Sequence, residues 1–140
     1  MRFIDERTGL SIMTRDDCLD LLRQDEVGRV AVTYNGHALV FPVNYVLDSD
    51  DVIFRTAPGS KFTAATRNRK AAFEIDHFDR SNRTGWSVLG SGWAEEITGA
   101  AKLDRVRQLP VTPWAPGPKA RWVRIRLERL SGRRISGTEA

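Results

Sequence analysis

The chain has very little cysteine, and this absence already narrows its chemistry. Cys18 is the only cysteine among 140 residues, so no disulfide can form within the chain. No second cysteine or histidine stands near it in sequence, and we expect a small core residue on a helix. No apolar run approaches the roughly 20 residues of a membrane span, and the first residues lack the apolar segment of a signal peptide. These absences predict a cytoplasmic protein.

The chain also has almost no excess of positive over negative side chains. Lys and Arg number 22 and Asp and Glu 18, which gives a net charge of +4. The basic residues are scattered, which favours solvated faces over the contiguous stripe of a nucleic-acid interface. We therefore expect neither nucleic acid nor membrane as a partner. A nucleic-acid-associated protein stays an alternative, which a steep salt dependence of DNA binding would support. A small anionic ligand fits the charge equally well.

The chain length and the apolar fraction of 41% are enough for one thin core. We expect a single domain over residues 1–140, with an N-terminal arm at 1–13 and a flexible tail at 136–140. A domain of this size hides only about two-thirds of the surface that its unfolded chain exposes. A second copy would hide more, which favours a homodimer.

Local signals predict short strands with a few helices. Thr14 is a good N-cap, and the helix that it begins carries one apolar stripe and ends at Gly28. Asn35-Gly36 predicts a type I′ hairpin. The further expected helices are 60–67 and 98–109, and the further strands are 51–56, 71–77, 85–97 with a bend at Gly90 and Gly92, and 121–130 before a turn at 131–132. About six strands at short spacing, without a βαβ rhythm, predict an all-β barrel or sandwich.

The segment Arg55-Thr56-Ala57-Pro58-Gly59-Ser60-Lys61 carries the clearest chemical signal. A predicted strand runs through Pro-Gly into a helix that begins at Ser60. Unpaired N–H groups at a helix start, a hydroxyl and two cations form a typical phosphate site. The G-x-x-x-x-G-K-[ST] order of an ATP-binding loop is absent. A capped helix with surface Lys and Arg explains the segment equally well when it is taken alone.

An ordered set of motifs resembles one family. It comprises Gly28-Arg29-Val30-Ala31-Val32, Phe41-Pro42-Val43-Asn44-Tyr45, Ile53 to Lys61, Phe73-Glu74-Ile75-Asp76, Gly85-Trp86-Ser87-Val88 and Gly92-Trp93-Ala94-Glu95-Glu96. From about Thr14 to Ile135 the chain resembles the pyridoxamine 5′-phosphate oxidase-like family of FMN-binding split barrels, in the branch with the nitroimidazole-resistance reductases. The resemblance implies a mainly β fold, a six-stranded split β-barrel with short flanking α-helices. It also implies a homodimer with FMN at the interface.

The resemblance assigns cofactor-binding roles to ten residues. Arg55, Thr56, Ser60 and Lys61 would hold the phosphate. Pro42, Val43 and Asn44 would run beside the isoalloxazine, and Trp86, Ser87 and Val88 would contact it from the far side of the groove. A strand bend is the alternative explanation for Asn44. For Trp86, the residue type favours a core or dimer position over a ligand contact. No Arg/His segment for the pyridoxal substrate is found near the C-terminus, which argues against vitamin B6 oxidation.

The resulting hypothesis is an FMN-dependent oxidoreductase that transfers a hydride between the flavin and a small organic acceptor. NAD(P)H is a candidate electron donor, and no catalytic side chain is identified, since the cofactor does the chemistry. An F420-dependent reductase and a non-enzymatic flavin or haem carrier or sensor are the alternatives.

We expect no metal site, because Asp76, His77 and Asp79 are more typical of a solvated turn. The loop around Trp114 is either a lid or a packed loop.

Overall fold

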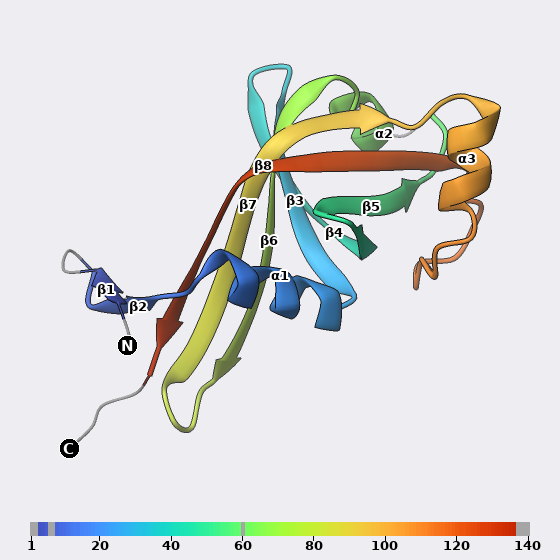
Figure 1. Ribbon diagram of the computed structural model, residues 1–140. Coiled ribbons are helices and arrows are strands. Elements are labelled where there is room, and N and C mark those ends of the chain that lie inside the picture. Colours follow the sequence, from blue (N-terminus) through green and yellow to red (C-terminus); the bar gives the residue numbers. More distant parts are fainter. Residues whose placement is uncertain (1–2, 6–7, 60, 137–140) are drawn as a thin grey trace.

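Antiparallel strands make up most of this computed structural model, which describes residues 3–5, 8–59 and 61–136 (Figure 1). The helices are α1 (Arg15–Gln24), α2 (Lys61–Ala65) and α3 (Ala100–Val106). The strands are β1 (Phe3–Asp5), β2 (Leu10–Ile12), β3 (Val27–Tyr34), β4 (His37–Asp48), β5 (Asp51–Thr56), β6 (Arg69–Asp79), β7 (Thr84–Glu96) and β8 (Arg121–Ile135). Within the described residues, every helix is too short or too polar to span a bilayer.

The long strand β8 closes the sheet into a barrel. The strand order is β1-β2-β8-β5-β4-β3-β6-β7, and β8 pairs with β7 as well. The strands β3 to β8 therefore form a closed ring of six, which confirms the predicted six-stranded split barrel. The small hairpin β1–β2 lies within the predicted N-terminal arm and pairs with the far end of β8. Of the predicted tail, residues 137–140 lie outside the described residues.

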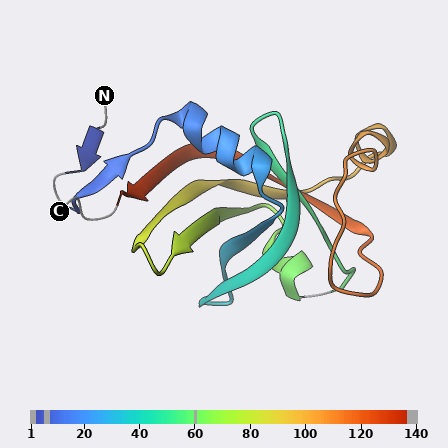
Figure 2. The ribbon, with the colours of Figure 1, turned by 90° about the horizontal axis from the view of Figure 1, so that it is seen from below.

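The barrel interior holds the main core, and α1 covers one side of it (Figure 2). Phe54, Phe73 and Ile125 are almost completely buried there. Cys18 of α1 is also fully buried, and burial raises the pKa of its thiol. The hydroxyl of Tyr45 donates a 2.7 Å hydrogen bond to the carbonyl oxygen of Leu22 at the end of α1. This bond satisfies a polar group that the core would otherwise leave unpaired.

A second, smaller core lies on the outer face of β5 and β8. Ile53 and Trp122 point outward from these strands, and α3 packs over them through Val106. Ile97 and Val111, which flank α3 on either side in sequence, complete the cluster. The chain segment 97–120 is therefore held against the outside of the barrel.

Several local predictions are confirmed. Thr14 caps α1, because its Oγ1 accepts a 3.1 Å hydrogen bond from the N–H of Asp17. Asn35 and Gly36 have φ angles of 51° and 78°, as a type I′ turn requires. The bend expected near Gly92 is a register shift between β7 and β8 at Ser91/Gly92.

Other boundaries were predicted wrongly, and glycine packing explains two of them. Gly28 lies inside β3 and does not end α1, which stops at Gln24. A Cβ at Gly28 would lie 2.1 Å from the ring of Phe73, so only glycine leaves enough room for that ring in the core. Gly132 makes no turn, because β8 continues through it to Ile135. A Cβ at Gly132 would lie 2.7 Å from Sγ of Cys18, so glycine lets α1 pack closely on β8. The helices expected at 60–67 and 98–109 are shorter than predicted.

Candidate functional site

Two predicted site residues lie side by side where the pairing between β4 and β5 stops. Tyr45 pairs with Phe54, so Asn44 and Arg55 lie one residue further along these neighbouring strands. Tyr45 and Phe54 are buried in the main core. Because side chains alternate between the faces of a strand, Asn44 and Arg55 project from the outer face of the barrel.

The loop after α3 binds both of these side chains. The N–H of Trp114 donates a 2.8 Å hydrogen bond to Oδ1 of Asn44, and Nε of Arg55 donates a 2.9 Å bond to the carbonyl oxygen of Lys119. The Arg55 guanidinium also lies 5.0 Å from the ring centroid of Trp122. These contacts leave the two terminal NH₂ groups of Arg55 without a hydrogen-bond partner among the described residues. A fixed guanidinium with open donors can bind an oxyanion.

The predicted phosphate segment is only partly described. Thr56 is buried at the end of β5, where its Oγ1 donates to the carbonyl oxygen of Ala57. Ser60 lies outside the described residues, and Lys61 is described only as the first residue of α2. At five residues, α2 is a single turn and a half, so its dipole adds little to anion binding. An anion here would depend mainly on side chains such as Arg55.

Pro42 and Val43 belong to a part of β4 that has one open edge. β4 pairs with β3 along residues 37–44, and its pairing with β5 begins only at Tyr45. Pro42 therefore needs no ladder donor on the β5 side. Its ring is exposed on the outer face, whereas Val43 packs against the main core. The open edge of β4, residues 37–44, ends at Asn44 beside Arg55.

A charged cluster lies beside Pro42 on the same outer face. Pro42 pairs with Arg29, and Arg29 pairs with Glu74 on β6. One terminal nitrogen of Arg29 donates to Oε1 of Glu74 at 2.9 Å and to Oδ2 of Asp76 at 3.0 Å. Burial and the neighbouring Asp76 raise the pKa of Glu74 from its ordinary 4.5 to about 7, although Arg29 opposes the shift. This cluster therefore takes up or releases a proton near neutral pH.

The three predicted residues on β7 do not share a cavity with β4 and β5. Val88 is fully buried in the main core, and Trp86 packs against that core with its ring centroid 6.3 Å from that of His77. Ser87 lies on the outer face, opposite Asp76. Three strand spacings separate Ser87 from Asn44, which is about 14 Å across the sheet. One chain therefore holds the two halves of the predicted site apart.

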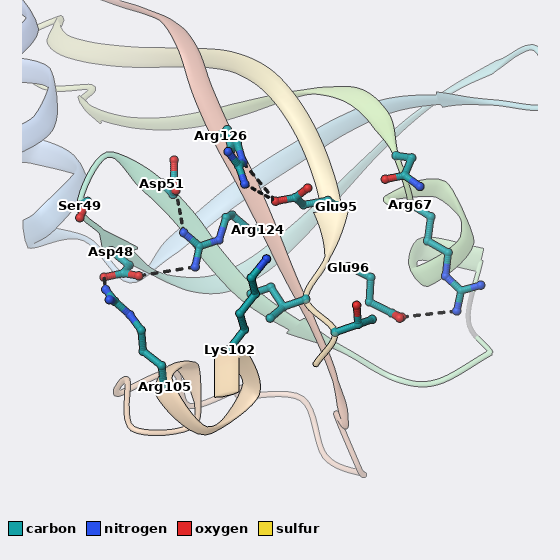
Figure 3. A pocket seen from close by; sticks show the side chains of 13 residues that line it. Asp48, Ser49, Asp51, Arg67, Glu95, Glu96, Lys102, Arg105, Arg124 and Arg126 are labelled. Atoms are coloured by element: carbon teal, nitrogen blue, oxygen red, sulfur yellow. Dashed lines mark hydrogen bonds and ion pairs between the residues drawn. The ribbon is translucent and has the colours of Figure 1, made fainter. Parts of the chain in front are cut away.

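Sequence reasoning missed a charged cavity beside α3. It has a volume of about 870 Å³ and contains none of the ten predicted site residues (Figure 3). Lys102, Arg105, Arg124 and Arg126 contribute most of its basic side chains. The alternation of β8 does indicate that Arg124 and Arg126 point outward, but no sequence signal indicates that α3 lies against them.

No metal site emerges from the described part of the chain. It contains no group of three or more His, Cys, Asp and Glu side chains placed to hold an ion. His77, which the sequence places between Asp76 and Asp79, lies opposite Trp86 in the β6–β7 pairing.

Several known proteins are similar to this chain in sequence and in fold. A family model described as pyridoxamine 5′-phosphate oxidase matches residues 14–134. An uncharacterized protein of Mycobacterium tuberculosis is 32% identical over 128 residues, which is 88% of this chain and 84% of that protein. The solved structure of the FAD binding protein from Mycobacterium smegmatis superposes with a TM-score of 0.77 and is 32% identical, covering 89% of this chain and 97% of that one.

A more distant structure shares the fold alone. It is a candidate 5-nitroimidazole antibiotic resistance protein from Bacteroides thetaiotaomicron, with a TM-score of 0.68 and 12% identity over 96% of this chain and 92% of that one. The expected split-barrel fold is therefore found in this distant structure as well.

Proposed function

The chain belongs to the pyridoxamine 5′-phosphate oxidase family, and on that premise we propose that it binds a flavin nucleotide along the open edge of β4 and acts as an oxidoreductase. The similar M. smegmatis protein is named for FAD binding, which supports a flavin here. One observation carries the proposal. The open edge of β4 ends at Asn44, and beside it Arg55 has guanidinium N–H groups without a hydrogen-bond partner among the described residues.

The described residues fit such a cofactor. The open edge offers backbone groups without a strand neighbour, and Pro42 presents an exposed ring beside it. Asn44 retains a second lone pair on Oδ1 and a second hydrogen on Nδ2 after its bonds to Trp114 and Glu26. The Arg55 donors match a phosphate in charge and geometry. Asn44 would therefore hold the polar edge of the ring and Arg55 the phosphate, and the family resemblance adds Thr56, Ser60 and Lys61 to the phosphate site.

A bound flavin would supply hydride transfer to a small organic acceptor. The residues of the chain would bind, orient and shield it. FMN and FAD share the ring, the ribityl chain and the first phosphate, so the same residues can serve either cofactor. The name of the M. smegmatis relative favours FAD, whereas the family resemblance favours FMN.

We further propose that two copies of the chain build each site. Trp86, Ser87 and Val88 lie too far from Asn44 to reach the same small ring in one chain. In a homodimer, β7 of the partner would approach the open edge of β4 and complete the groove. Trp86, which is half-buried, would then contribute its ring, while Val88 would contribute only backbone atoms, since its side chain is in the core.

The absorption spectrum of the purified protein tests the flavin proposal. We expect visible flavin bands, and chromatography of the released cofactor then identifies FMN, FAD or F420. Arg55→Gln should weaken flavin binding by roughly tenfold or more, because it removes a charged donor. Arg23→Gln is the matched control, since Arg23 lies on α1 and pairs with Asp20. A protein that binds no flavin and no F420, or equal affinities in both variants, would refute the proposal.

A further inference from the structure

The cavity beside α3, here called the α3 cavity, is large enough for a small organic ligand. Its volume of about 870 Å³ falls within the usual range of roughly 300–1,000 Å³ for such sites. Its walls come from the β4–β5 turn, the end of β7, α3, the first half of β8 and the residues that follow α2 (Figure 3). Segments that are distant in sequence therefore converge on it.

Ion pairs on one side of the cavity fix its arginines in place. Arg124 donates to Asp51 at 2.8 Å and lies 3.7 Å from Asp48. Asp48 also accepts a 2.8 Å bond from Arg105 of α3. The side chain of Asp48 is only 10% exposed, so its charge is compensated by these two guanidinium groups. α3 is thereby held at a set distance from the sheet.

The opposite side of the cavity has the same arrangement. Arg126 contacts Glu95 at 3.0 Å, and Arg67 contacts Glu96 at 3.4 Å. All four carboxylates of the lining therefore have an arginine partner. The guanidinium groups remain at the surface of the cavity with further donor hydrogens, because each has five N–H groups.

Lys102 is the exception among the charged residues of the lining. It projects from α3 into the cavity (Figure 3) and has no ion-pair or hydrogen-bond partner among the described residues. Five cationic side chains face four carboxylates in the lining, so one positive charge is left over. An anionic group of a ligand would be the natural partner of Lys102.

The remaining lining residues suit the hydroxyl groups of a ligand. Ser49, Asn68 and Thr98 offer hydroxyl and amide groups, and the paired carboxylates can accept further hydrogen bonds. Ile97, which is 6% exposed, adds one small apolar contact at the edge of the second core. A ligand with one phosphate and several hydroxyls matches this combination.

We propose that the α3 cavity binds the ribose phosphate of a ribonucleotide, with Lys102 at the phosphate. Two sources share this chemistry. One is the adenylate half of FAD. Arg121 links the cavity to the predicted phosphate segment, because it pairs with Thr56 of that segment and its Nε lies 3.9 Å from Oε1 of Glu96 in the cavity wall. The other is a separate ribonucleotide. The inference does not depend on flavin binding, since the free ribonucleotide can be tested alone.

Calorimetric titration of the full chain with AMP, adenosine and inorganic phosphate tests the proposal. We expect AMP to bind at least tenfold more tightly than either of the others. Lys102→Gln should weaken AMP binding by roughly tenfold, because a charged hydrogen bond is lost. Arg107→Gln is the matched control, since Arg107 caps the same helix, pairs with Asp104 and lies outside the lining. Circular dichroism verifies that both variants fold.

Three results would overturn the proposal: no AMP binding, equal AMP affinity in wild type and Lys102→Gln, or inorganic phosphate binding as tightly as AMP. Titration with FAD and FMN then separates the two sources. If Lys102→Gln weakens FAD but not FMN, the cavity holds the adenylate half of FAD. If it weakens AMP and leaves both flavins unchanged, the occupant is a separate ribonucleotide. A protein that binds AMP but no flavin would refute the flavin proposal alone.

Discussion

Oδ1 of Asn44 accepts a 2.8 Å hydrogen bond from the backbone N–H of Trp114, which lies 70 positions further along the chain. This bond joins the open edge of β4 to the loop that follows α3. Arg55 holds the same loop at Lys119. The side chain of Trp114 remains 69% exposed, so the loop is anchored through its backbone. A ligand bound at Asn44 would therefore be coupled to the position of this loop.

Asn44→Ala should loosen the loop around Trp114. The variant removes the acceptor for the Trp114 amide, and we expect faster hydrogen exchange there. The free energy of unfolding should fall by about 1 kcal/mol, the usual contribution of one hydrogen bond. Hydrogen exchange and urea denaturation measure the two effects. Asn82→Ala, which removes a bond to Asp79 in the β6–β7 turn, should leave exchange at Trp114 unchanged. Unaltered exchange in Asn44→Ala would contradict the coupling.

Mixed dimers should recover part of the flavin affinity that is lost in each parent variant. If one copy supplies Arg55 and its partner supplies Trp86, Arg55→Gln and Trp86→Leu affect different halves of each site. A mixed dimer then has one site with both defects and one intact site. We expect co-expression of the two differently tagged variants to restore part of the binding, measured by flavin fluorescence. Two tagged copies of Arg55→Gln serve as the control, and failure of the mixed pair to exceed it would argue for a site within one chain.

Glu74 should make the stability fall as pH rises toward neutrality. Its pKa is about 7 in the folded protein, above the ordinary 4.5. Between these values the folded state binds more protons than the unfolded state, so the free energy of unfolding decreases as pH rises. The contribution is complete below about pH 4.5 and is lost as pH passes through 7. Arg29 and Asp76 are the charged groups in contact with it.

Glu74→Gln should flatten this part of the pH profile, because the glutamine side chain does not titrate. Urea denaturation of both proteins at several pH values between 4 and 8 measures the difference. Arg124 and Asp51, a comparable pair on β8 and β5, provide the comparison, and Asp51→Asn should leave the slope that Glu74 causes in place. Parallel pH profiles for wild type and Glu74→Gln would show that the pKa of Glu74 is not raised.

Gly92→Ala should destabilise the barrel severely. A Cβ at this position would lie 1.6 Å from the carbonyl oxygen of Arg126, which is backbone and cannot turn aside. The register shift between β7 and β8 occurs at this residue, so relief would require the strands to separate. We expect a loss of about 3 kcal/mol or more by urea denaturation. Ser91→Ala, one residue earlier, should change stability by less than about 1 kcal/mol.

Local patterns were sufficient to predict much of the barrel. Alternating side chains identified the faces of β8, Asn35-Gly36 identified a hairpin, and Thr14 identified the start of α1. These features depend on residues within a few positions of one another, so the sequence contains them directly. Pro42 lies on the open edge of β4, where the ladder donor that proline lacks is not needed.

The sequence by itself thus determined the inward and outward faces of the strands, their turns and the residues with suitable chemistry. Only the tertiary structure decided which of those residues meet. Arg29 contacts Glu74 and Asp76, which lie 45 and 47 positions away in the sequence. Trp114 contacts Asn44, which lies 70 positions away. β8 closes the ring by pairing with both β5 and β7, and α3 closes the cavity by docking on it. Such contacts follow from the packing of the whole chain, because a strand's own sequence specifies its buried face but not its neighbour.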